Sequence, residues 1–477
     1  MSLTKMPNMT LSNIAEACGG TYIGAEEKKL ETVSAVATDS RQVEEGFLYV
    51  PIKGARVDGH EFIPDVFQKG ALAVLSEKKL ENPAGPYILV ESSITAMRKI
   101  ASFYRRSLNI KVVGITGSVG KTSTKEMIAS VLSEKYNVLK TAGNFNNEIG
   151  LPLTIFRIRK EHEVAVLEMG ISDFGEMSRL AEMANPDVCV ITNIGWCHLE
   201  NLGTRDGILR AKTESFAYIK EQGVAVLNGD DDKLCTKKQV NGKPALFYGI
   251  HEKSDVDPDL VKAVYATEVV NNGFDGMLAK IHTPKGCFDA EISIPGEHNV
   301  YNALAATAVG LTLGLTIEEI RAGIKNAKTI PGRTNVLKLE DITIIDDCYN
   351  ANPVSMKASL AVLSKAKGRS IAVLGDMGEL GNEERTLHAE VGTSVGENHI
   401  QTLFATGELS KEYVTHAKLA NPDVELYYYK TREEMTEALL AYVRSGDTIL
   451  VKASHFMEFP KVIEAFCEKY KEKKERE

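Results

Sequence analysis

A glycine-rich turn that ends in a lysine and two hydroxyl residues is the most chemically informative segment of the sequence. It reads Gly117-Ser118-Val119-Gly120-Lys121-Thr122-Ser123 and lies between an apolar run, Val112–Thr116, and a predicted helix, Lys121–Lys135. Strand, turn and helix in this order place main-chain amides around a phosphate, with the lysine at the β- and γ-phosphates and the threonine on Mg²⁺. Ile115 stands where the full pattern has its first glycine, so the match is to a shorter G-x-x-G-K-T form. We predict an ATP site here, against the alternative of a chance turn.

Two polar residues follow the next predicted buried strands. Glu168 lies near the end of the strand Val164–Met169, and His198 follows the strand Val188–Asn193 on a loop. Taken singly, a glutamate or a histidine is more often a surface or packing residue. The carboxyl ends of parallel strands meet at one sheet edge, where ligands bind, so the shared position of the two residues favours a site. We predict that Glu168 is a metal ligand beside Thr122.

Two other charged segments are most simply interpreted as exposed to solvent. Lys212 lies on a predicted helix, Arg205–Phe216, and its residue type by itself indicates a solvated lysine. The run Asp230-Asp231-Asp232 lacks the ligand spacing of a calcium loop, and we expect it to be a solvated strand end.

Two polar groups could contact a substrate or a nucleotide. The triplet Asp39-Ser40-Arg41 offers a hydroxyl and a guanidinium suited to a diphosphate or a uracil edge, although such a triplet is also common in turns. Asn299 and Asn302 begin an alanine-rich predicted helix, and they could face an adenine ring or cap the helix. The residue types leave both choices open.

Arg333 and two carboxylates mark the start of the last part of the chain. Arg333 follows Pro331-Gly332, a hinge from which an arginine can swing onto a γ-phosphate. Asp346 and Asp347 end and follow a predicted strand, Ile342–Asp346. Neighbouring residues of a strand point to opposite sides, so these two carboxylates are not expected to share a proton.

The pattern of predicted elements indicates an α/β protein with three domains. Residues 1–107 read as a small mixed α/β domain with a first helix at Leu11–Cys18. Residues 108–330 alternate buried strands with helices, which indicates a parallel sheet carrying the P-loop, and an irregular, strand-containing stretch lies at Phe247–Pro295. Residues 331–477 resume the alternation and read as a smaller Rossmann-like domain, which we expect to close over the active site.

Composition excludes several classes of protein. The chain has 477 residues, of which 43% are hydrophobic and 25% charged, as in ordinary globular proteins. A net charge of −9 disfavours nucleic acid and anionic membranes as partners. Seven cysteines without a C-x-x-C pair fit a reducing cytosol, and neither a signal core at Met1–Thr10 nor an apolar stretch long enough to span a bilayer is present. We expect a cytoplasmic, monomeric protein without membrane insertion.

The motifs form an ordered series that resembles the Mur ligases, the ATP-dependent amide-bond-forming enzymes of peptidoglycan precursor synthesis. The resemblance covers nearly the whole chain and matches the three-domain order. Its segments are Thr38–Arg41, Gly117–Thr122, Gly143–Pro152, Leu167–Gly170, Asn193–Glu200, Ala211–Glu214, His298–Ala303, Pro331–Arg333, Asp346–Pro353 and Leu374–Gly381. Single segments are weak signals, whereas the ordered series is a strong one.

Two segments, Asn146–Pro152 and Tyr349–Pro353, are similar to the branch of the family that joins D-alanyl-D-alanine to UDP-N-acetylmuramoyl-tripeptide. The Asp-Asn-Pro-Arg motif of the branch that grips a diamino acid is absent. The resemblance implies that ATP activates the tripeptide carboxylate as an acyl phosphate. It leaves open whether the third peptide residue is L-lysine or meso-diaminopimelate. A folylpolyglutamate-synthase-like ligase and a non-catalytic nucleotide-binding relative are the alternatives.

The resemblance also implies roles for individual residues. Catalytic roles fall to Lys121, His198, Lys212 and Arg333. ATP is held by Gly117, Ser118, Val119, Gly120, Lys121, Thr122, Ser123, Asn299, Asn302, Arg333 and Asp347. Two Mg²⁺ ions are held by Thr122, Glu168, His198 and Lys212, with Lys212 converted by CO₂ into an anionic carbamate. Substrate contacts fall to Asp39, Ser40, Arg41, Asn146, Asn147, Asn350 and Asn352.

Overall fold

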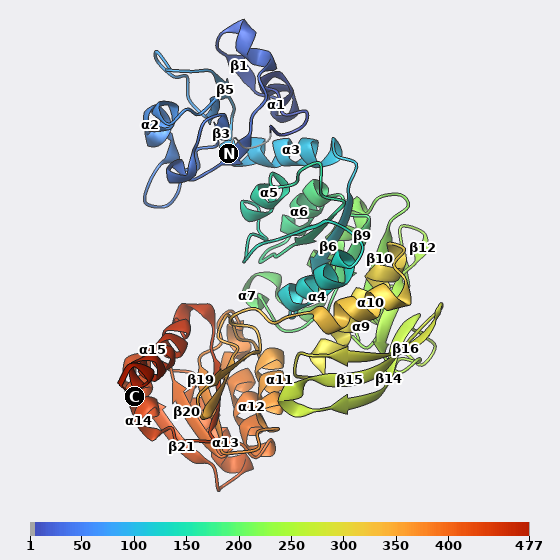
Figure 1. Ribbon diagram of the computed structural model, residues 1–477, viewed down its shortest axis with the longest axis vertical. Coiled ribbons are helices and arrows are strands. Elements are labelled where there is room, and N and C mark those ends of the chain that lie inside the picture. The colour runs from blue at the N-terminus through green and yellow to red at the C-terminus, as the bar shows by residue number, and fades with distance from the viewer. Residues whose placement is uncertain (1–4, 477) are drawn as a thin grey trace. The chain divides into compact units, whose positions relative to one another are not determined.

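Three large β-sheets organise the chain in the computed structural model, which describes residues 5–476 (Figure 1). The chain forms two compact units, each assembled from several segments. The first unit comprises residues up to 116, 135–190 and 212–225, and the second comprises 117–134, 191–211 and 226 onward. No helix in the described part of the chain is both long and apolar enough to cross a membrane.

A five-stranded sheet with the order β1-β5-β4-β3-β2 belongs to the first unit. Strands β2 to β5 are parallel, and β1 is antiparallel to β5. The elements are β1 (Thr21–Ile23), β2 (Ala35–Ala37), β3 (Phe47–Tyr49), β4 (Ala73–Ser76), β5 (Tyr87–Leu89), α1 (Leu11–Cys18), α2 (Ile63–Gln68) and α3 (Ser93–Arg106). Helix α3 begins where the Ser92 hydroxyl accepts a hydrogen bond from Thr95 N, and its Met97 and Ile100 side chains are fully buried. The predicted mixed α/β module is present, and its predicted first helix is α1.

The central sheet has nine strands in the order β16-β15-β14-β13-β10-β9-β6-β8-β7. They are β6 (Lys111–Thr116), β7 (Val138–Lys140), β8 (Val164–Glu168), β9 (Val188–Ile191), β10 (Val224–Asn228), β13 (Leu246–Ile250), β14 (Val264–Asn271), β15 (Met277–Thr283) and β16 (Gly286–Ile292). The pairs β6–β8, β7–β8, β10–β13 and β13–β14 are parallel, and β6 and β8 are two of the strands for which the sequence predicted a parallel sheet. Strands β14, β15 and β16 form an antiparallel meander, so the sheet is mixed. This meander lies within the stretch that the sequence pattern left irregular.

Helices follow the strands of the central sheet. They are α4 (Lys121–Ser133), α5 (Gly150–Ile155), α6 (Glu176–Ala184), α7 (Leu199–Leu202), α8 (Arg205–Thr213), α9 (His298–Thr312) and α10 (Ile317–Asn326), and a short ribbon pairs β11 (Gln239–Val240) with β12 (Lys243–Pro244). Helix α4, which carries the end of the glycine-rich turn, packs against α9 and α10. The approach of α10 is close, because a Cβ on Gly323 would lie 2.4 Å from Val131 Cα. This packing fixes the helix that starts at Lys121.

The third sheet has the order β17-β18-β22-β19-β20-β21, with β17 antiparallel to β18 and the other pairs parallel. Its elements are β17 (Asn335–Leu339), β18 (Ile342–Asp346), β19 (Ser370–Gly375), β20 (Thr402–Thr406), β21 (Glu425–Tyr429), β22 (Thr448–Lys452), α11 (Pro353–Leu363), α12 (Glu384–Glu397), α13 (Lys411–Ala420), α14 (Arg432–Tyr442) and α15 (Pro460–Arg476). Neighbouring residues along these strands pack into two separate hydrophobic cores, one on each face of the sheet. Ile345 and Leu450 pack with α11 to α13, whereas Ile344 and Ile449 pack with α14 and α15. Helices therefore cover both faces, as a Rossmann-like domain requires.

Candidate functional site

The glycine-rich turn has the backbone geometry of a phosphate-binding loop. Gly117 has φ 151° and Gly120 has φ 80°, so both lie in the region that favours glycine. A Cβ on Gly117 would lie 1.9 Å from Thr192 Oγ1, which no side chain tolerates. Helix α4 begins directly after Gly120, so its free N–H groups and positive end face the turn.

Asn193 braces this turn, a role that the sequence pattern did not reveal. Its side-chain oxygen accepts a hydrogen bond from Val119 N at 2.9 Å, and its main-chain oxygen accepts one from Ser118 N at 3.0 Å. Its amide Nδ2 donates to Val119 O at 3.0 Å, and Thr192 Oγ1 donates to the same oxygen at 2.7 Å. The turn is therefore held in place before any ligand binds.

Lys121 and Thr122 are the first two residues of α4. Lys121 Nζ donates to Gly117 O at 2.8 Å and to Ser118 O at 3.4 Å, so the ammonium group folds back over the turn. Thr122 is buried. A lysine ammonium above a ring of amides at a helix N-terminus binds an anion such as a phosphate.

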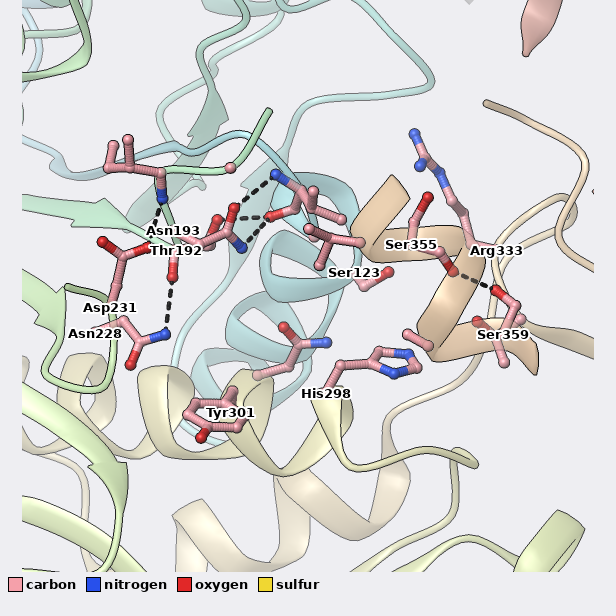
Figure 2. A pocket seen from close by; sticks show the side chains of 18 of the residues that line it. Ser123, Thr192, Asn193, Asn228, Asp231, His298, Tyr301, Arg333, Ser355 and Ser359 are labelled. Atoms are coloured by element: carbon pink, nitrogen blue, oxygen red, sulfur yellow. Dashed lines mark hydrogen bonds between the residues drawn. The ribbon is translucent and has the colours of Figure 1, made fainter. Parts of the chain in front are cut away.

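A cavity of about 460 Å³ lies beside the turn, entirely within the second unit (Figure 2). Its wall includes three residues of the turn region, Val119, Gly120 and Ser123. Other lining residues are Thr192, Asn193, Asn228, Asp231, Tyr248, His298, Tyr301, Asn302, Arg333, Asp347, Ser355, Ser359 and Lys452. The cavity is thus lined both by the predicted phosphate-binding turn and by two residues from the last part of the chain, Arg333 and Asp347. The family resemblance implies that these two residues contact ATP.

Asn302 lines the cavity, and Asn299 holds it in place. Asn302 Nδ2 donates to Asn299 Oδ1 at 2.8 Å, while Asn302 Oδ1 accepts from Thr124 Oγ1 at 2.7 Å. Asn299 Nδ2 donates in turn to Pro295 O at 2.7 Å. Neither residue is the N-cap of α9, which is Glu297, so the capping alternative is not what the structure shows. Asn299 is buried, and it lines a second, small pocket together with Ser123, Arg333 and Thr334.

The acidic run at the end of β10 is only in part a solvated strand end, because Asp230 and Asp231 are half-buried and Asp232 is exposed. Asp231 Oδ2 accepts from Ile194 N at 2.7 Å, and burial raises the pKa of its carboxyl. Asp230 forms an ion pair with the fully buried Lys262. Asp232 accepts from Arg205 Nη1 at 3.0 Å. Of the three carboxylates, Asp231 lines the cavity.

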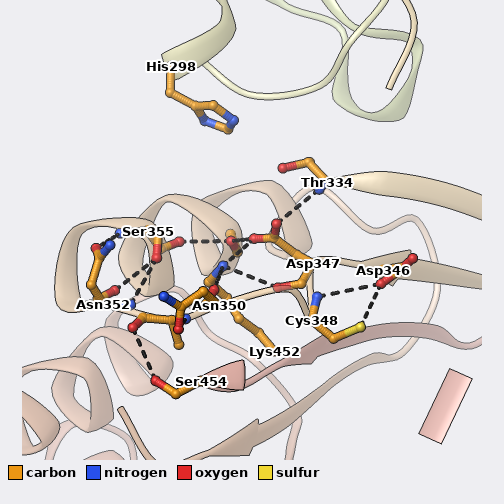
Figure 3. Close-up of polar contacts among 12 residues, drawn as sticks. His298, Thr334, Asp346, Asp347, Cys348, Asn350, Asn352, Ser355, Lys452 and Ser454 are labelled. Atoms are coloured by element: carbon orange, nitrogen blue, oxygen red, sulfur yellow. Dashed lines mark hydrogen bonds and ion pairs between the residues drawn. The ribbon is translucent and has the colours of Figure 1, made fainter. Parts of the chain in front are cut away.

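Arg333 rests on an aromatic ring in this structure. Its Cζ lies 4.0 Å from the centroid of the Tyr349 ring, a cation–π contact. Asp347 Oδ1 accepts from Thr334 N at 3.0 Å (Figure 3). Asp346 Oδ2 accepts from Gly332 N at 2.8 Å. The two carboxylates thus accept hydrogen bonds from different residues.

His198 pairs with a carboxylate that the sequence pattern did not single out. His198 Nδ1 lies 2.7 Å from Glu379 Oε2, and Glu379 belongs to the loop after β19. The hydrogen bond from His198, together with the nearby charge of Lys121, lowers the pKa of the Glu379 carboxyl. The imidazole therefore has a fixed partner.

Glu168 and Lys212 belong to the first unit, whereas Thr122 and His198 belong to the second. Glu168 is buried at the end of β8, where its Oε1 accepts from Asn146 Nδ2 at 2.8 Å. Lys212 is fully buried on α8, so the expectation of a solvated lysine was wrong.

The predicted substrate residues have local partners. Arg41 Nη2 lies 2.6 Å from Asp39 Oδ2, and this hydrogen bond lowers the pKa of the Asp39 carboxyl to about 2. Asn147 Oδ1 accepts from Gly150 N at 2.8 Å at the start of α5. Asn352 is the N-cap of α11, and Asn350 O accepts from a buried lysine. Their contacts with a substrate stay predictions, as does any contact of Ser40.

The residue types predicted to bind magnesium suit an ion that is carried by the nucleotide. Among the residues that the structure describes, no group of three or more His, Cys, Asp and Glu side chains could hold a metal ion. Mg²⁺ is usually bound by one or two carboxylates together with substrate phosphates and water, so a preformed protein cage is not required. The Thr122 hydroxyl and the Glu168 carboxylate are hard oxygen donors of the right kind.

Three family models match successive parts of the chain. The description "Mur ligase family, catalytic domain" matches residues 32–117, "Mur ligase middle domain" matches 115–310, and "Mur ligase, glutamate ligase domain" matches 332–455. A Bacillus subtilis UDP-N-acetylmuramoyl-tripeptide–D-alanyl-D-alanine ligase is 37% identical, covering 97% of this chain and 99% of that protein. Crystal structure I of MurF from Acinetobacter baumannii is 31% identical, with a TM-score of 0.87 and coverage of 98% and 100%. MurF ligase from Thermotoga maritima in complex with ADP is 31% identical, with a TM-score of 0.79 and coverage of 92% and 98%.

Proposed function

Because the chain belongs to the Mur ligase family, we propose that it joins D-alanyl-D-alanine to UDP-N-acetylmuramoyl-tripeptide at the expense of ATP. The observation that carries the proposal is the full-length similarity to a ligase of that name, at 37% identity over 469 residues. The phosphate-binding turn and the adjoining cavity supply the site that such a reaction needs.

The reaction begins when the tripeptide carboxylate attacks the γ-phosphorus of ATP and ADP leaves. Lys121 and Arg333 offset the charge that develops on the phosphoryl oxygens, and the amides of the turn orient the nucleotide. The product of this step is an acyl phosphate. The free amine of D-alanyl-D-alanine then attacks the acyl carbon, and the tetrahedral intermediate expels inorganic phosphate to leave the amide.

Magnesium would neutralise phosphate charge in the first step. Thr122, Glu168 and His198 are the residues that we propose to hold it, together with Lys212 as a carbamate. Carbamate formation converts a cation into an anion and requires the neutral amine. The full burial of Lys212 supports a role inside the fold and not at the surface.

We further propose that Asn302 faces the adenine ring and that Asn299 supports it. Asp39, Ser40 and Arg41 would bind the UDP end of the acceptor, and Asn146, Asn147, Asn350 and Asn352 would contact its peptide or the dipeptide. Closure of the last domain, hinged at Pro331-Gly332, would exclude water from the acyl phosphate. Solution scattering with and without nucleotide and acceptor tests this closure, and identical profiles would contradict it.

A cytoplasmic location and a monomeric state complete the proposal. All seven cysteines are free thiols, which fits a reducing compartment. Size-exclusion chromatography with light scattering tests the monomer.

Phosphate release from ATP tests the proposed function. The assay uses UDP-N-acetylmuramoyl-tripeptides carrying either L-lysine or meso-diaminopimelate, each with and without D-alanyl-D-alanine. Release that depends on both substrates supports the proposal and identifies the third peptide residue. Release that depends on folate and glutamate would instead favour a folylpolyglutamate-synthase-like ligase, and no release with any pairing would favour a non-catalytic relative.

A further inference from the structure

A buried lysine that the proposed reaction does not use lies at the end of β22, beside the cavity. Lys452 is 2% exposed, and its Nζ lies 2.5 Å from Asp347 Oδ2, 3.3 Å from Asp347 O and 3.2 Å from Asn350 O (Figure 3). An ammonium group has three N–H donors, and these three acceptors account for all of them. Lys452 therefore has no N–H donor left for a ligand, and its ammonium group holds oxygen atoms of the protein in place.

The Asp347 carboxylate accepts hydrogen bonds from three separate segments of the chain. Its Oδ2 accepts from Lys452 and from Ser359 Oγ on α11, the latter at 2.5 Å. Its Oδ1 accepts from Thr334 N at 3.0 Å. The carboxylate is thus the link between the buried lysine and the segment that carries Arg333.

The turn that follows β18, which carries Asp347, Tyr349 and Asn350, also contacts the segment around Arg333. Tyr349 N donates to Gly332 O at 3.2 Å, and the Arg333 guanidinium lies over the Tyr349 ring. Gly332 has φ 77°, and a Cβ there would lie 3.1 Å from Tyr349 Cβ. The place of Arg333 therefore depends on the conformation of the turn after β18, which Lys452 holds at both Asp347 and Asn350.

We propose that Lys452 is a positioning residue for Arg333, acting through Asp347 and Thr334. This inference rests on the proposed function, in which Arg333 offsets charge on the γ-phosphate. Without the ammonium group the buried Asp347 carboxylate has no cation beside it, so it must turn toward water or take up a proton. Either change weakens its bond to Thr334 N and frees the Arg333 segment.

The test is a double-mutant cycle with Lys452→Met, Arg333→Met and the double variant. We expect Lys452→Met to lower kcat for phosphate release by roughly a hundredfold, the loss that a displacement of about 1 Å can produce. ADP affinity, measured by calorimetry, should fall much less than kcat, because ADP lacks the γ-phosphate whose charge Arg333 is proposed to offset. On the Arg333→Met background, Lys452→Met should cause no further loss, since it acts through the same guanidinium. Losses that multiply, or an unchanged kcat in Lys452→Met, would overturn the proposal.

Arg369→Met is the matched control for a general loss of stability. Arg369 pairs with the buried Asp447 just before β22, at 2.9 and 2.7 Å, so this variant damages the same sheet at the opposite end from Lys452. It should lower the unfolding temperature and leave kcat unchanged at a temperature where the protein is folded. A fall in kcat equal to that of Lys452→Met at equal loss of stability would contradict the positioning role.

Lys452→Gln keeps the test decisive if Lys452→Met fails to fold. Its amide retains two N–H donors for Asp347 and Asn350, so we expect a kcat between those of Lys452→Met and the natural protein. A folded Lys452→Gln with natural kcat and no coupling to Arg333→Met would refute the inference. Failure of the proposed function is distinct, because the natural protein itself would then release no phosphate with the acceptor and the dipeptide.

Discussion

His198 Nδ1 lies 2.7 Å from Glu379 Oε2, and both residues adopt a left-handed backbone conformation, with φ 52° and 62°. Such a conformation is unfavourable for residues other than glycine, so the two loops hold this pair at a cost. A carboxylate at Nδ1 keeps the proton on that nitrogen and leaves the lone pair of Nε2 for another ligand. The pair is therefore an orienting contact for a predicted metal ligand.

Glu379→Ala should lower kcat, because the His198 ring loses the group that fixes its orientation. Removing such an orienting carboxylate typically costs about 10- to 100-fold in activity or metal affinity. Glu379→Gln retains an oxygen acceptor and should lose less. Steady-state phosphate release measures the effect, and two-dimensional ¹H–¹⁵N spectra report the His198 tautomer. A Glu379→Ala variant with an unchanged tautomer and natural kcat would exclude this role.

Gly117→Ala should abolish nucleotide binding. The new Cβ would lie 1.9 Å from Thr192 Oγ1, so the turn must move away from the strand end that braces it. We expect calorimetry with a non-hydrolysable ATP analogue to show no binding.

Gly446→Ala is the control for the backbone cost alone. Gly446 also has a positive φ, 86°, but no atom lies within 4 Å of the point that its new Cβ would occupy. Its substitution should cost stability on the order of 1 kcal/mol and leave nucleotide affinity intact. Equal nucleotide affinity in the two variants would show that the clash at Gly117 is relieved without loss of the site.

The elements that the sequence predicted well are those with long apolar runs. β18 matches its predicted bounds, Ile342–Asp346, because it is a mostly buried run between polar turns. The three-residue strands β1 and β2 and the short helix α5 have no period to detect, and they were not predicted. The antiparallel meander after β13 lies in the stretch that was predicted only as irregular and strand-containing.

The phosphate-binding turn was recognisable because its chemistry is local in sequence. Tertiary partners were not: the brace from Asn193 and the pair between Lys452 and Asp347 join segments that only the fold brings together. Burial of Lys212 was equally hidden, since lysine is a surface residue on average and the pattern of one short helix does not decide which face is covered.

Acidic pH should destabilise the protein through His388. Its Nε2 accepts from Met377 N at 2.9 Å and its Nδ1 lies 2.6 Å from Glu384 O, so the folded state uses the neutral ring. Burial lowers the pKa of His388 below its ordinary value of 6.5. The unfolded chain therefore binds more protons below about pH 6.5, and stability falls as pH drops from there through the folded pKa.

His388→Gln is the matched variant, because an amide oxygen can accept from Met377 N and takes up no proton. Urea unfolding at pH 7.5 and pH 5.5 should show a smaller loss of stability in this variant than in the natural protein. Identical losses would mean that another group carries the acid sensitivity.

Lys212→Ala should inactivate the enzyme, and a short carboxylic acid should restore part of the activity. Lys212 is fully buried, so its removal leaves a space that acetate or propionate can enter, and their carboxylates replace the anionic end of the proposed carbamate. Lys262→Ala is the control, because Lys262 is buried to the same degree but pairs with Asp230, and a carboxylic acid cannot replace its positive charge. ¹³C spectra of protein equilibrated with ¹³C-bicarbonate should show a carbamate signal that Lys212→Ala lacks. Near-normal turnover of Lys212→Ala, or rescue of both lysine variants alike, would show that the carboxylic acid is not standing in for a carbamate.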